Sequence, residues 1–87
     1  MSDHATDFRG DVLAAIRAAV EEKIPGAVCV ATGGNGHYTI DVVSEAFAGK
    51  GLVDSQRLVY RAINHLLAGA TPPIHAVDTL TTRTPKS

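Results

Sequence analysis

The sequence predicts an α+β fold: a two-layer α/β sandwich with a three-stranded sheet and helices on one face. Two long segments have apolar residues at helical spacing, and a short helical turn precedes the second of them. Three short runs are rich in β-branched residues and bounded by Gly or Pro. Their order is α-β-β-α-α-β, with helices and strands segregated. We expect the 87 residues to form one domain, with residues 1–6 and 83–87 frayed.

The first helix is predicted to begin at Phe8, with Asp7 as its N-cap and Pro25-Gly26 as its stop. Its apolar residues recur every three or four positions, which places them on one stripe. This stripe comprises Phe8, Val12, Leu13, Ile16, Ala19, Val20 and Ile24.

A β-hairpin is predicted next. The strands are Ala27–Thr32 and Tyr38–Val43, and the turn between them is Gly33-Gly34-Asn35-Gly36. In the second strand, alternation places Tyr38, Ile40 and Val42 on the face that helices must cover.

The second half begins with a short helical turn over residues 44–47, which Gly49-Lys50-Gly51 interrupts. A longer helix is predicted from Asp54 or Ser55 to Leu67, followed by Gly69. Its expected buried stripe comprises Leu58, Val59, Ala62, Ile63, Leu66 and Leu67. A third strand, His75 to Thr82, follows the Pro72-Pro73 connection.

Composition excludes several function classes. The chain has a net charge of -1, which argues against a dedicated, strongly basic nucleic-acid binder. No acid-base-nucleophile set, phosphate loop or zinc-spacing motif is present, so we expect no enzyme activity. The start lacks the features of a secretory signal and no stretch is long and apolar enough to cross a bilayer, so the expected location is the cytoplasm, without membrane association.

Candidate metal ligands are few. His75 follows two prolines that restrict its approach, and His37 begins the second predicted strand. Imidazole nitrogen suits a borderline metal such as iron, although His75 can also bond a carbonyl at a strand end and His37 can be a solvated hairpin residue. If Val28 and Val30 face the helices, the single cysteine, Cys29, lies on the open face of its strand, where packing is a better interpretation than ligation.

The second half also carries a basic bias. Lys50 lies between two glycines, and Arg57 and Arg61 are one turn apart on the long helix. The Gly49-Lys50-Gly51 loop partly resembles the phosphate-contacting loop of K-homology domains, although a helix break also explains it. These three cations are the candidate surface for nucleic acid or for an acidic partner.

The order of elements and several local strings resemble the BolA-like proteins. The resemblance runs from about residue 37 to the C-terminus. Its motifs are His37-Tyr38, Val42-Val43-Ser44, Phe47, Gly49-Lys50, Arg57-Leu58-Val59-Tyr60, Ile74-His75-Ala76-Val77 and Thr84-Pro85.

This resemblance implies a fold related to the type II K-homology domain. It also implies a non-catalytic iron-sulfur role with a monothiol glutaredoxin, in which His75 is a ligand to a shared 2Fe-2S cluster. The glutaredoxin cysteine and glutathione supply the other iron, so no cofactor is expected in the isolated chain. The family's second ligand is a Cys or His in the loop before the second strand, and His37 at the end of this loop is the candidate.

An alternative function is a nucleic-acid-binding, transcriptional or stress-response regulator with DNA as its partner. The sequence also leaves open whether the chain forms a weak homodimer.

Overall fold

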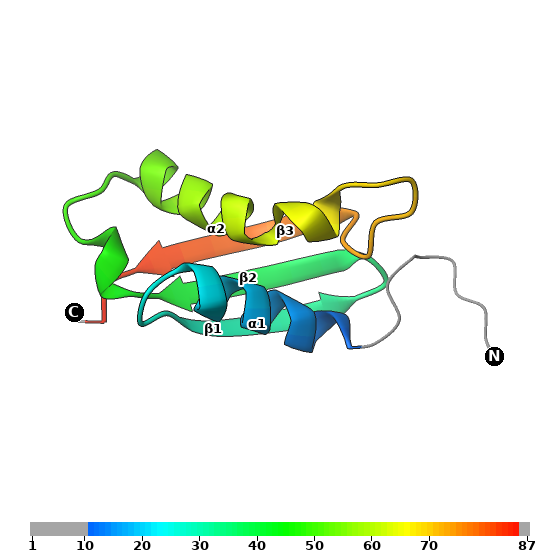
Figure 1. The fold of residues 1–87 in the computed structure, drawn as a ribbon, viewed down its shortest axis with the longest axis horizontal. Coiled ribbons are helices and arrows are strands. Elements are labelled where there is room, and N and C mark those ends of the chain that lie inside the picture. Colours follow the sequence, from blue (N-terminus) through cyan, green and yellow to red (C-terminus); the bar gives the residue numbers. More distant parts are fainter. Residues whose placement is uncertain (1–10, 86–87) are drawn as a thin grey trace.

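Two helices cover one face of a three-stranded sheet, which confirms the predicted fold class (Figure 1). The computed structural model describes residues 11–85. The elements in chain order are α1 (Val12–Lys23), β1 (Val28–Gly34), β2 (His37–Val43), η1 (Glu45–Phe47), α2 (Leu52–Leu67) and β3 (Ala76–Arg83). The short helical turn before the long helix is thus the 3-10 helix η1.

The sheet has the order β1-β2-β3. β1 and β2 pair antiparallel, whereas β2 and β3 pair parallel. A parallel pair needs a crossover connection, and α2 supplies it across the covered face of the sheet. Because the pairing is parallel, the first residues of β2 and β3 lie at the same end of the sheet, where His37 pairs with Ala76.

The hairpin turn between β1 and β2 is tighter than predicted. Only Asn35 and Gly36 lie between the strands, and both have positive φ angles, 54° and 85°. Two consecutive residues of this kind match the right-handed twist of a two-residue hairpin, for which Asn-Gly is a preferred sequence. The two glycines before them therefore continue β1 up to the turn.

The core lies between the sheet and the two helices. Tyr38, Ile40 and Val42 are buried, as the alternation in this strand predicts. The two α-helices contribute Ile16, Ala19, Val20, Val59, Ala62, Ile63 and Leu66, η1 contributes Phe47, and the connections contribute Ile24 and Ile74. Burial of these apolar side chains is the main driving force for folding.

The predicted orientation of β1 is wrong. Val28 and Val30 are 60% and 55% exposed, whereas Cys29 is buried and pairs with Val42. The run from Ala27 to Ala31 is apolar on both faces, so its pattern alone does not define which face is inside. The pairing with β2 decides it, because a one-residue shift would exchange the faces of the strand.

The helix starts also differ from prediction. The expected cap Asp7 and first residue Phe8 lie outside the described residues. The described helix has Asp11 as its N-cap, whose carboxylate accepts hydrogen bonds from the backbone N–H groups of Leu13 and Ala14 at 3.0 and 3.3 Å. α2 begins at Leu52, earlier than expected, and Gly51 is its N-cap.

β3 is shifted by one residue. It begins at Ala76, so His75 lies immediately before the strand. It ends at Arg83, which we expected to be frayed but which pairs with Val43 and donates from its guanidinium to Asp41 at 2.8 Å. Within residues 11–85, neither helix is long and apolar enough to cross a membrane.

Candidate metal centre

His75 is held by the backbone on both sides. The preceding residue, Ile74, is buried, and its N–H donates to the carbonyl of Leu66 at 3.1 Å. The N–H groups of His75 and Ala76 both donate to the carbonyl of Gly36, at 2.8 and 2.9 Å. These three bonds fix the backbone of an exposed histidine between the end of α2 and the hairpin turn.

Gly36 also packs directly against the His75 ring. A Cβ atom at this position would lie 2.6 Å from His75 Nδ1 and 2.7 Å from Cγ. Its φ of 85° is in the region that L side chains rarely adopt. The run Gly33-Gly34-Asn35-Gly36 predicts a turn, but nothing in the sequence indicates that Gly36 also forms the surface beneath a histidine.

His37 is the first residue of β2, and it lies between β1 and β3. Its neighbours in the sheet are Gly34, which has no side chain, and Ala76. The imidazole is 59% exposed, and its Nδ1 lies 3.2 Å from the Asp78 carboxylate. Asp78 was not among the predicted site residues, because the strand pattern does not indicate that its side chain reaches His37.

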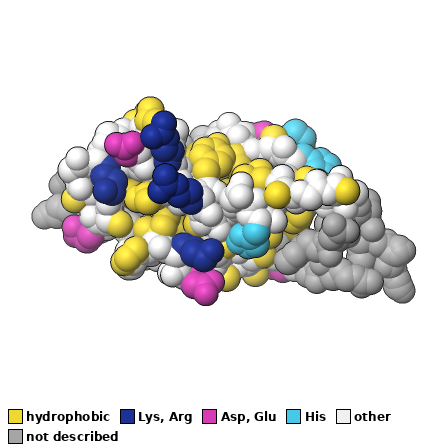
Figure 2. All heavy atoms as spheres, turned by 45° about the horizontal axis from the view of Figure 1, so that its top comes forward, with side chains coloured by type: hydrophobic (Ala, Val, Ile, Leu, Met, Phe, Trp, Pro, Cys, Tyr) yellow, Lys and Arg dark blue, Asp and Glu magenta, His cyan; other side chains and the backbone are white. Residues whose placement is uncertain are grey.

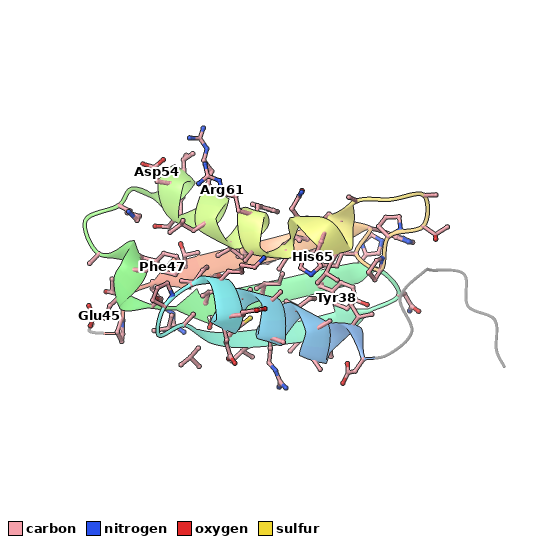
Figure 3. All side chains as sticks on the ribbon, in the orientation of Figure 1. Tyr38, Glu45, Phe47, Asp54, Arg61 and His65 are labelled. Carbon is pink, nitrogen blue, oxygen red and sulfur yellow. The ribbon has the colours of Figure 1, made fainter. Side chains whose placement is uncertain are left out.

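The fold brings the two predicted ligands together. The ring centroids of His37 and His75 are 6.5 Å apart, with an angle of 76° between the ring planes. Both residues are exposed and lie at the end of the sheet that contains the hairpin turn, where Tyr38 is labelled in Figure 3. Two histidines that are far apart in the sequence therefore offer imidazole nitrogens from one patch of surface.

A shallow cleft borders this patch. The hairpin turn, the loop after α2 and the first residue of α1 line it. Its lining residues are Val12, Asn35, Gly36, Tyr38, Ala70, Thr71, Pro72, Pro73 and His75. The lining has an apolar character and contains no Asp, Glu, Lys or Arg side chain, which suits contact with another protein better than binding of a free ion.

Cys29 does not belong to this site. It is buried beneath the helices, and its backbone N–H donates to the Glu21 carboxylate at 3.1 Å. Burial, with a smaller contribution from the charge of Glu21, raises the pKa of the Cys29 thiol to about 11. Because the thiolate is the form that binds metals, a buried thiol with this pKa is a packing residue rather than a ligand.

The described donor set offers two nitrogen ligands, which is the number that one iron of a 2Fe-2S cluster takes besides the sulfides. Among the described residues, no three His, Cys, Asp or Glu side chains form a group that could hold a metal ion. Each iron of a 2Fe-2S cluster needs two ligands besides the sulfides, and two histidines serve one iron in Rieske centres. His37 and His75 match that number, and the second iron would need ligands from another molecule.

The predicted basic residues also come together, at the opposite end of α2 from His75. Lys50, Arg57 and Arg61 line one hollow with Asp54 and Leu58. Arg57 makes an exposed ion pair with Asp54, at 3.7 Å. Figure 2 shows Lys and Arg side chains gathered over this end of the molecule, and Asp54 and Arg61 extend from α2 away from the sheet in Figure 3.

The family model for BolA-like proteins matches residues 13–87 of this chain. The chain belongs to the BolA-like protein family. No curated protein sequence matches it in a direct comparison. The family match covers both histidines and the basic hollow, and the resemblance in the sequence motifs is thereby confirmed.

Solved structures of similar shape share the fold of this chain. BolA1 from Arabidopsis thaliana has a TM-score of 0.74 to this BolA-like chain at 22% identity, covering 91% of this chain and 99% of that one. BolA1 from Mus musculus has a TM-score of 0.65 at 29% identity, covering 98% and 74%. The XC975 protein has a TM-score of 0.61 at 34% identity, covering 92% and 96%.

A Gly36→Ala substitution should displace the His75 ring. The new methyl group would overlap the imidazole, and the residue would keep an unfavourable φ, so we expect a loss of about 1–3 kcal/mol in unfolding free energy. The His75 imidazole signals should also shift in two-dimensional NMR spectra. Gly34→Ala is the matched control, because a Cβ atom there would meet nothing within 4 Å. Equal effects of the two substitutions would contradict the proposed contact.

Cys29 should be chemically inert in the folded chain. With its pKa raised to about 11, the thiolate is scarce at pH 8 and becomes more abundant as the pH rises. Alkylation of the native chain should therefore be at least about 100-fold slower than in the urea-unfolded chain, because burial adds to a pKa difference of about two units. Its rate should increase between pH 8 and pH 10. Equal rates for native and unfolded chains would show that Cys29 is accessible as a thiolate.

Proposed function

We propose that this chain is a non-catalytic iron-sulfur adaptor or regulator that binds a monothiol glutaredoxin. In this proposal, His75 and His37 are the ligands of one iron of a 2Fe-2S cluster shared between the two proteins. The observation that carries the proposal is the convergence of the two rings, 6.5 Å apart, at one exposed end of the sheet.

The need for a partner follows from the ligand count. Two imidazoles can serve one iron, and the buried Cys29 cannot supply a thiolate to the other. The resemblance to BolA-like proteins implies that the glutaredoxin cysteine and glutathione provide those thiolates. The apolar cleft beside His75 gives the partner a surface to contact next to the ligands.

Histidine ligation suits a protein that transfers or senses a cluster. Neutral imidazole ligands raise the reduction potential of a 2Fe-2S cluster relative to four thiolates. Metal binding by histidine is also lost when the ring is protonated, so ligation is sensitive to acid. A cluster held in this way is expected to be more labile than one held by thiolates alone.

Reconstitution with a monothiol glutaredoxin, iron, sulfide and glutathione tests this function. The wild-type chain should give a visible circular dichroism spectrum that differs from that of the glutaredoxin alone. His75→Ala should abolish this spectrum and His37→Ala should alter it, because each removes an imidazole ligand. Cys29→Ala should leave it unchanged.

His65→Ala is the matched control, because His65 is an exposed histidine on α2 outside the site. A His75→Ala spectrum that equals the wild-type spectrum would contradict the adaptor function. If the wild-type chain and the glutaredoxin give no new spectrum when they are mixed with iron, sulfide and glutathione, this result contradicts the shared cluster.

The hollow lined by Lys50, Arg57 and Arg61 favours a second candidate function, which is nucleic-acid binding. Three cations converge there with one carboxylate, and Tyr60 on the same helix is 40% exposed. Cations of this kind neutralise phosphates, and an exposed aromatic ring can stack on a base. The hollow and the histidine pair lie at different ends of α2, so one chain can carry both functions.

A Lys50→Ala, Arg57→Ala double substitution tests the second candidate. If both side chains contact phosphates, duplex DNA should bind more weakly, and the slope of log K against log salt should fall by about 2. The Lys23→Ala control removes a cation at the end of α1 instead. Binding that is insensitive to both salt and the double substitution would exclude this surface as a nucleic-acid site.

A further inference from the structure

The side chain of Asp78 contacts one of the two proposed ligands. Its Oδ1 lies 3.2 Å from Nδ1 of His37, and the two side chains come from adjacent strands, β3 and β2. They are 55% and 59% exposed. An exposed pair of this kind contributes little to the free energy of unfolding. The hydrogen bond can nevertheless orient the His37 imidazole.

An irregularity in the sheet places Asp78 there. Along the parallel pair, Tyr38 pairs with Val77, but the next residue, Thr39, pairs with Thr79. Asp78 is therefore an extra residue in β3, opposite a continuous β2. A bulge of this kind changes the direction of a side chain and is frequent next to functional sites. Here it brings a carboxylate to the first residue of the central strand.

The hydrogen bond selects one form of the His37 ring. An ionised carboxylate only accepts hydrogen bonds, so Nδ1 must carry the proton that it donates to Asp78. In the neutral ring, Nε2 then has no proton and keeps its lone pair. A metal ligand needs such a nitrogen, and carboxylates commonly fix metal-bound histidines in this way.

We propose that Asp78 is a positioning residue that holds His37 in the Nδ1–H tautomer and leaves Nε2 available to the iron. This inference rests on the proposed function and adds a residue to the same site. The position of His75 is restrained in another way, because its backbone is bonded to Gly36 and its ring packs on that glycine. At His37, the Asp78 carboxylate is the hydrogen-bond partner of the ring.

The tautomer can be measured in the metal-free chain. Long-range ¹H–¹⁵N NMR spectra at pH 8, where an ordinary imidazole is neutral, distinguish the two ring nitrogens. Wild-type His37 should be mainly the Nδ1–H form. In Asp78→Ala it should change to mainly Nε2–H, and Asp78→Asn should keep the wild-type form because its amide oxygen still accepts a hydrogen bond. Asp54→Ala, which removes an exposed carboxylate on α2, should have no effect.

A second measurement connects the tautomer to ligation. In the reconstituted complex with a monothiol glutaredoxin, cluster loss to a chelator should be about tenfold faster or more for Asp78→Ala than for the wild type. Asp78→Asn should restore most of the wild-type rate. Thermal unfolding of the metal-free variants should be nearly unchanged, which separates orientation of the ring from a loss of folding.

The outcomes separate the two proposals. An unchanged His37 tautomer in Asp78→Ala would overturn the role of Asp78, whatever the glutaredoxin result. A changed tautomer with unchanged cluster loss would overturn its role in ligation. If the wild-type chain forms no cluster complex, the proposed function fails and Asp78 has no iron ligand to position, although the tautomer still shows whether it orients His37.

Discussion

The site depends on the attachment of β3 to the hairpin turn. The Gly36 carbonyl accepts hydrogen bonds from His75 and Ala76, and the parallel ladder with β2 begins beside it. The α2 crossover returns the chain to the end of the sheet where β2 starts, and this brings His75 beside His37. Without this attachment the two imidazoles would belong to separate parts of the molecule. A backbone contact thus creates the proposed donor pair.

Much of the fold follows from sequence patterns. The apolar spacing of both helices, the turn signal at Gly33-Gly34-Asn35-Gly36 and the alternation in β2 predict the existence and order of these elements, although the turn is tighter and the helix starts differ. The orientation of β1 could not be read in this way, since residues around Cys29 are apolar on both faces and pairing alone defines the inner one. The His37–His75 pair was predicted as two ligands, but its proximity needs the tertiary fold. The contact of Asp78 depends on a bulge that leaves no sequence signal.

The two ends of α2 have different chemistry. Near its C-terminal end lie the His75 imidazole and the apolar cleft beside it. Near its N-terminal end, Lys50, Arg57 and Arg61 form a positively charged hollow. Cys29, the chain's single thiol, is in the core between sheet and helices and is separate from both surfaces. In the proposed function, the two histidines supply the nitrogen ligands and the partner supplies the thiolates.

The most direct test of the central claim is to count the nitrogen ligands that this chain contributes. The chain would be labelled with ¹⁵N-histidine, combined with unlabelled glutaredoxin and glutathione, and its reduced 2Fe-2S complex examined by pulsed electron-nuclear double resonance. The proposed site predicts strong couplings from two ¹⁵N nuclei, with one lost in His37→Ala. A cluster that shows no strong ¹⁵N coupling would contradict histidine ligation by this chain.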